Sequence, residues 1–243
     1  SPQPPSQPGS AVTRLNRRIH LADLVRISLG GVNCYLVLAR EGFVLVDTGT
    51  PEKRAAVEAA LERAGCRPGD LTLIVITHGD YDHAGNAVYL RDTFGAKIAM
   101  HRDDAARVQL GDWRVGFKPK PDKFSWIFRE VSRFVTVGEF DVFEPDIYLE
   151  DEQSLEEYGF DAIVLHLPGH TSGSLGILTT DSELICGDLM DNVGRPSLQF
   201  FIDDMTAARA SLERLRRLGV ETVYPGHGKP FLLERVREGH ASG

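Results

Sequence analysis

Four side chains that can bind a metal ion lie within six residues of this chain. They follow the apolar run 71–76, which predicts a buried strand because it is short and rich in β-branched residues. A loop after a strand can turn its side chains towards one point, since its backbone is no longer paired in the sheet. Imidazole and carboxylate groups at this spacing predict a metal site, with the candidate ligands His78, Asp80, Asp82 and His83.

Three further apolar segments end in the same way. Segment 163–167 leads into Pro-Gly-His, segment 183–186 into Gly-Asp, and segment 220–224 into Pro-Gly-His-Gly. These motifs add three candidate ligands, His170, Asp188 and His227. A single histidine more often serves in a core or on a surface. Several strand ends that all carry such groups indicate one shared metal centre.

The order of these motifs resembles that of the metallo-β-lactamase-fold metallohydrolases. The matching elements are His-x-Asp-x-Asp-His at 78–83, Pro-Gly-His-Thr at 168–171, Gly-Asp at 187–188, Pro-Gly-His-Gly at 225–228 and an early Asp-Thr-Gly at 47–49. The resemblance extends from about Leu24 to about Leu233, which is nearly the whole chain. It implies an α/β (α+β) fold of the four-layer αββα sandwich type.

Carried over residue by residue, the resemblance implies two metal sites bridged by Asp188. The first site would use His78, Asp80 and His170, and the second Asp82, His83 and His227. Two divalent ions, expected to be zinc, would supply a metal-bound hydroxide at neutral pH. Asp82 is the candidate catalytic residue, as a proton shuttle, with a role as ligand alone as the alternative. Asp47 would either orient a ligating histidine or cap its own turn.

Asp80 departs from the commonest family pattern, which has a second histidine at this position. An aspartate adds a negative charge, so the formal positive charge of the site falls by one. Carboxylate oxygens are also harder donors, which makes iron or manganese compatible with the site. Because aspartate is shorter than histidine, we expect the first site to be the weaker one.

Two functions of different kinds fit this pattern. The first is a metal-dependent hydrolase that cleaves an ester, thioester, lactone or lactam-type bond. The alternative is a non-haem iron oxidoreductase that handles dioxygen, nitric oxide or a persulfide, and a metal-binding regulatory domain without turnover is a third. The flavo-diiron branch of this fold has a carboxylate at the position of Asp80, as Glu, but also a flavin domain for which this chain has no room. We therefore expect hydrolysis.

The composition is typical of a globular enzyme. The 243 residues are 42% hydrophobic and 26% charged, with a net charge of −8. An acidic chain disfavours nucleic acid as a partner, and no apolar stretch approaches the ~20 residues that cross a bilayer. A small-molecule substrate is expected, and the sequence leaves open whether the protein forms a homodimer.

Three widely spaced cysteines, Cys34, Cys66 and Cys186, favour a reducing, cytoplasmic location.

Strands and helices are predicted to alternate around the candidate ligands. The predicted strands are 24–29, 33–39, 43–47, 71–76 and 96–100, together with the three segments that precede His170, Asp188 and His227. The predicted helices are 51–64, 85–94 and 205–218. The last is amphipathic, with Ala208, Leu212, Leu215 and Leu218 on one side.

We expect one catalytic domain at 21–243 after a Pro-rich tail at 1–20, which is expected to be an extended arm without function. An insertion at about 109–145 is rich in aromatic and basic residues, among them Trp113, Phe124 and Trp126. It would serve as a lid over the site, or as a cap or dimer interface, with a nucleic-acid or membrane surface as a weaker interpretation. The acidic stretch 139–157 is expected to be a solvated face.

Overall fold

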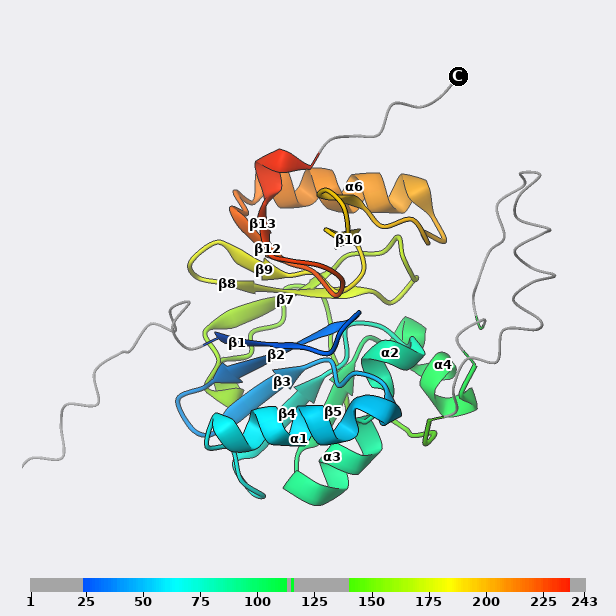
Figure 1. Ribbon diagram of the computed structural model, residues 1–243. Coiled ribbons are helices and arrows are strands. Elements are labelled where there is room, and N and C mark those ends of the chain that lie inside the picture. The colour runs from blue at the N-terminus through cyan, green and yellow to red at the C-terminus, as the bar shows by residue number, and fades with distance from the viewer. Residues whose placement is uncertain (1–23, 113–114, 116–139, 237–243) are drawn as a thin grey trace, which may run out of the picture.

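Two β-sheets lie face to face in the computed structural model, and helices cover their outer faces (Figure 1). The structure describes residues 24–112, 115 and 140–236. In Figure 1, α1 (Arg54–Arg63) and α3 (Ala87–Phe94) lie below the first sheet, and α6 (Met205–Arg217) lies above the second. This order of helix, sheet, sheet and helix is the four-layer sandwich that the family resemblance implied.

The first sheet contains six strands in the order β1-β2-β3-β4-β5-β6. Their bounds are β1 Leu24–Ser28, β2 Asn33–Leu38, β3 Phe43–Val46, β4 Leu71–Val75, β5 Lys97–Met100 and β6 Ile147–Tyr148. The first three strands pair antiparallel, and β3 to β6 run parallel. Parallel strands bring their carboxyl ends to one edge of the sheet, so the loops after β3, β4 and β5 lie close together. In Figure 1, α2 (Tyr81–Ala84) and α4 (Ala105–Leu110) lie at this edge.

The second sheet contains five strands in the order β13-β12-β9-β8-β7. Their bounds are β7 Ala162–His166, β8 Leu175–Thr179, β9 Glu183–Ile185, β12 Thr222–Tyr224 and β13 Phe231–Leu232. β9 and β12 pair in parallel, and the other neighbouring strands in this sheet order pair antiparallel. A separate ribbon of β10 (Met190–Asp191) and β11 (Ser197–Leu198) follows β9.

Three apolar clusters fill the spaces between the four layers. In β3, Leu45 packs towards α1 and α3, whereas Val44 and Val46 pack between the two sheets. Strands that are buried on both faces need continuous apolar runs, which explains why the central strands show no polar alternation. Ala208 and Leu212 of α6 pack on the outer face of the second sheet.

Several expectations about the elements need refinement. The helix predicted at 85–94 is α3, which begins at Ala87, and the short helix α2 at 81–84 was not predicted. Leu218 is exposed just after α6 instead of lying on its buried side. The acidic side chains of 141–157 are exposed as predicted, but Phe143, Leu149 and Leu155 between them are buried. The tail at 1–20 and most of the insertion, with Trp113, Phe124 and Trp126, lie outside the described residues.

None of the helices in the described part of the chain has the length and apolar character that a membrane crossing requires.

Candidate functional site

The seven predicted ligands come together where the loops of the two sheets meet. His78, Asp80, Asp82 and His83 follow β4 of the first sheet, in the loop and in α2. His170 follows β7, Asp188 follows β9 and His227 follows β12 of the second sheet. Gly226 allows a close approach at this point, because a Cβ atom there would lie 2.2 Å from Asp188 Oδ1. Each of the two sheets therefore contributes to one polar centre.

The four histidines are oriented by hydrogen bonds at Nδ1. His83 Nδ1 lies 2.8 Å from Asp47 Oδ2, and His227 Nδ1 lies 2.8 Å from the carbonyl oxygen of Gly31. His170 Nδ1 donates to the carbonyl of Phe201. His78 Nδ1 lies 3.0 Å from Thr77 Oγ1, whose own proton goes to Asp47. A hydrogen bond at one ring nitrogen fixes the orientation of the ring, which makes Nε2 of each ring the nitrogen that could bind an ion.

The Nε2 atoms and the carboxylates face one another at short distances. Asp188 Oδ1 lies 3.3 Å from His83 Nε2, and Asp188 Oδ2 lies 3.1 Å from His227 Nε2. Asp82 Oδ2 lies 3.3 Å from His227 Nε2. Three atoms here are buried without a hydrogen-bond partner among the described residues, namely His78 Nε2, His83 Nε2 and Asp188 Oδ1. Buried polar atoms are normally satisfied, so orphaned donor atoms that converge fit a bound cation.

The donor atoms form two groups that a metal ion could occupy. His78, His170 and Asp188 form one group, and Asp82, His83 and His227 form the other. Asp188 thus belongs to the first group and also contacts His83 and His227 of the second. This is the position that the family resemblance implied for a bridging residue.

The protonation of the site follows from burial and from the carboxylates. Burial lowers the pKa of His78 well below its ordinary value, and its neighbours His83 and His170 lower it further. Burial also lowers the pKa of His170 and His227, but the hydrogen bonds to Asp80 and Asp188 outweigh it. The pKa is thereby raised to about 9 for His170 and to about 10 for His227. A cation would have to displace these protons.

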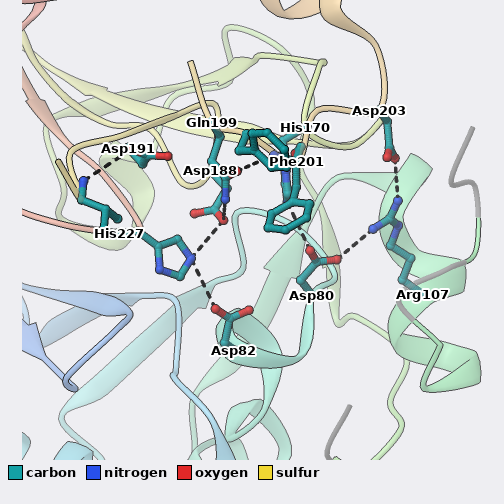
Figure 2. Close-up of a pocket in the computed structure, with 12 residues that line it drawn as sticks. Asp80, Asp82, Arg107, His170, Asp188, Asp191, Gln199, Phe201, Asp203 and His227 are labelled. Carbon is teal, nitrogen blue, oxygen red and sulfur yellow. Dashed lines mark hydrogen bonds and ion pairs between the residues drawn. The ribbon is translucent and has the colours of Figure 1, made fainter. Parts of the chain in front are cut away.

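Asp80 divides its two oxygens between the candidate ligands and an arginine. Its Oδ2 lies 3.1 Å from His170 Nε2 and 3.6 Å from His78 Nε2. Its Oδ1 accepts a hydrogen bond of 2.8 Å from Arg107 Nη1, and Arg107 Nη2 donates to Asp203 Oδ2 at 2.9 Å (Figure 2). Burial raises the pKa of Asp80, but the hydrogen bond from His170 and the nearby positive charges hold it well below its ordinary value.

A pocket of about 440 Å³ opens onto this centre. Five of its lining residues were predicted as ligands, and Figure 2 shows several of them around it. The lining residues that the sequence did not single out are Arg107, Asp191, Val193, Gln199, Phe200, Phe201 and Asp203. The sequence carries little signal for them, because they stand in loops, in the two-residue strand β10 and in a short helix, without a motif. Gln199 donates to Asp188 Oδ2 at 3.2 Å and so helps to orient it.

A third group of donor atoms lies apart from this pocket, at His101, Asp103 and His166. The rings of His101 and His166 stack with centroids 4.1 Å apart and an angle of 8° between their planes. The lone pairs of imidazole nitrogens lie in the ring plane, so two parallel stacked rings do not direct them at one ion. The stack therefore does not have the geometry of a metal site.

An αββα sandwich that gathers histidines and aspartates at the facing edges of its sheets defines a class of metal-dependent hydrolases. The chain belongs to the metallo-beta-lactamase superfamily, whose family model matches residues 27–227. This membership confirms the predicted family and fold and places the chain among the metallohydrolase enzymes.

Individual relatives agree with this assignment. The chain is 26% identical over 206 residues to the "Probable metallo-hydrolase MJ0888" of Methanocaldococcus jannaschii, which covers 81% of this chain and 87% of that protein. It is 28% identical over 228 residues to the "Acyl-coenzyme A thioesterase MBLAC2" of Bos taurus, with 84% and 75% covered. The crystal structure of TTHA1623 "in a di-iron-bound form" superimposes with a TM-score of 0.65 at 27% identity, over 87% of this chain and 94% of that one.

Proposed function

We propose that this protein hydrolyses an uncharged ester, thioester or lactone that carries an apolar group, with two divalent ions as cofactors. The observation that supports it most is the set of four imidazoles whose Nδ1 atoms are tied and whose Nε2 atoms converge with the carboxylates of Asp82 and Asp188. The bound ions would lower the pKa of a bound water and polarise the substrate carbonyl. A lactam-type bond remains within the same reaction class.

Asp82 is suited to move a proton in this reaction. Its side chain is 35% exposed and lines the pocket, so it reaches both the centre and a bound substrate. Burial raises the pKa of Asp82, but the charge of His83 and the hydrogen bond from His227 outweigh burial and lower it. An ionised Asp82 would accept a proton at the attacking water and pass it to the leaving group, while also serving as a ligand.

The pocket lining favours a substrate without a negative charge near the reacting bond. The two ions would offset the charges of Asp80, Asp82 and Asp188, and the pocket lining also holds the carboxylates of Asp191 and Asp203. Arg107 is the only lysine or arginine among its described lining residues, and both of its terminal nitrogens are held by Asp80 and Asp203. Val193, Phe200 and Phe201 are 76%, 82% and 50% exposed at the pocket and offer an apolar surface to the substrate.

The test combines elemental analysis with matched substrates. We expect zinc, and a kcat/KM that is higher for an octanoyl thioester or an alkyl lactone than for a phosphodiester or a carboxylate-bearing β-lactam. Phe200→Ser should lower kcat/KM about tenfold for the octanoyl thioester, the scale of a lost apolar contact, and less than about twofold for the acetyl thioester. A higher kcat/KM for the anionic substrates would contradict the proposal that the substrate is apolar and uncharged.

Iron is the alternative metal, because Asp80 adds a hard oxygen donor and a 27%-identical structure is described as di-iron-bound. Iron content together with dioxygen consumption that requires a reductant, and no hydrolysis of the panel, would favour the oxidoreductase instead. Iron content with hydrolysis would change the metal and keep the reaction.

A further inference from the structure

Arg107 is almost fully buried beside the candidate ligands, at 4% exposure, and joins two carboxylates that are distant in the sequence. It donates to Asp80, which is 27 positions away, and to Asp203, which is 96 positions away. A buried guanidinium is stable only with such partners. Because its terminal nitrogens hold two carboxylates in fixed directions, it can control how Asp80 is turned.

The free oxygen of Asp80 has the position of a ligand atom. Ligand atoms about 2.0–2.1 Å from one tetrahedral ion lie about 3.3 Å from each other. Asp80 Oδ2 lies 3.1 Å from His170 Nε2 and 3.6 Å from His78 Nε2, which brackets this value. Arg107 holds the other oxygen, Oδ1, at 2.8 Å. The carboxylate is therefore turned so that one oxygen meets the arginine and the other meets the two histidines.

The backbone around Asp80 is shaped for this contact. A Cβ atom on Gly79 would lie 2.6 Å from Arg107 Cβ, so only glycine lets α4 approach the loop so closely. The Gly79 N–H donates to Asp104 Oδ2 at 2.8 Å, one turn before Arg107. The close approach of α4 to this loop thus brings the guanidinium of Arg107 to the short side chain of Asp80.

From this geometry we infer that Arg107 is a positioning residue for the first metal site, which fixes Asp80 with Oδ2 towards His78 and His170. The role depends on the metal site that the proposed function uses, and it does not depend on hydrolysis. Arginine compensates here for the limited reach of aspartate at a position where histidine is commoner.

The test measures zinc affinity at each site separately. His227→Ala leaves the first group of ligands complete, and His170→Ala leaves the second. Calorimetric titration of each apo-protein with zinc, checked by elemental analysis, then reports one site. Arg107→Met should raise the zinc Kd about 10- to 100-fold in the His227→Ala background, the usual effect of losing a residue that orients a ligand, and less than about twofold in the His170→Ala background. An unchanged Kd in the first background, or equal losses in both, would overturn the role.

Two matched controls separate orientation of Asp80 from simple cross-linking of loops. Asp203→Asn keeps the contact between Arg107 and Asp80, so it should change the first-site Kd much less than Arg107→Met does. Adding Arg107→Met to an Asp80→His variant should have little effect, because the carboxylate to be oriented is gone. A loss with Asp203→Asn as large as with Arg107→Met, or an undiminished loss beside Asp80→His, would overturn the inference.

Arg107→Lys covers the case in which the methionine variant does not fold. The ammonium group of lysine can still pair with Asp80, but it lacks the planar guanidinium that binds both carboxylates. We therefore expect a smaller loss of zinc affinity at the first site than with Arg107→Met. No loss at all in a folded lysine variant would count against a geometric role of the guanidinium. Absence of zinc binding in both single-site backgrounds would instead reject the proposed metal sites themselves.

Discussion

At the scale of single residues, the site depends on atoms that face away from it as much as on those that face into it. Asp47 was a minor feature of the sequence and Thr77 was not singled out, yet Asp47 binds both His83 and Thr77, and Thr77 binds His78. These contacts settle the role of Asp47 in favour of orienting a histidine. They also explain why His83 and His78 present Nε2 to the centre.

The raised pKa values of His170 and His227 predict that zinc binding releases protons. With pKa values of about 9 and about 10, both rings are positively charged imidazolium groups at pH 7.5 before an ion binds. Zinc must displace these protons, so its affinity should increase with pH up to about 10. Calorimetry in two buffers of different ionisation enthalpy counts the protons released.

A variant makes this count specific. His227→Ala lacks one of the two protonated imidazoles, so it should release about one proton fewer than the parent at pH 7.5. Identical proton release by the two proteins would show that His227 is already neutral before metal binding.

At the scale of elements, the sequence located the strands that bear ligands and missed the short elements that hold their loops. The run 71–76 was predictable because both faces of β4 are buried, which leaves an unbroken apolar signal. Strands of two residues, such as β6 and β10, leave no periodic signal. Arg107 was missed for a related reason: a charged residue in a short helix suggests exposure, and its partners lie 27 and 96 positions away.

The start of α4 joins the two main ligand loops through Asp104. This fully buried carboxylate accepts hydrogen bonds from the N–H of Gly79 at 2.8 Å, from Thr171 Oγ1 at 2.9 Å and from the N–H of Gly173 at 2.9 Å. Gly79 stands beside His78, and Thr171 beside His170. One side chain therefore connects the loop after β4 with the loop after β7.

Asp104→Ala should destabilise the whole fold. It leaves buried donors without an acceptor, and each such group costs about 1–3 kcal/mol. We expect the free energy of unfolding in urea to fall by about 2–5 kcal/mol. Asp103→Ala is the matched control, since the neighbouring side chain is 53% exposed and should change stability by less than about 0.5 kcal/mol. Equal stability of the two variants would mean that the loops are held by other contacts.

At the scale of the whole molecule, the candidate metal centre lies across the junction of the two sheets. His78 and His83 follow a strand of the first sheet, and His170, Asp188 and His227 follow strands of the second. The sheets already share a continuous apolar cluster that includes Val46, Val75 and Val164. The fold should therefore persist without metal, while bound ions would add a second connection between the sheets.

Removal of metal by a chelator should lower the melting temperature without unfolding the protein at 25 °C. An ion that binds only the folded state adds about 4 kcal/mol when its free concentration is 1,000 times its Kd. At about 2–4 °C per kcal/mol for a chain of this size, the melting temperature should fall by about 10 °C in EDTA. Asp188→Ala, which removes the residue shared by both groups, should show a shift of less than about 3 °C, because little metal is left to remove. A fully metal-loaded parent that melts at the same temperature with and without EDTA, after elemental analysis proves the metal gone, would show that the ions do not connect the two sheets.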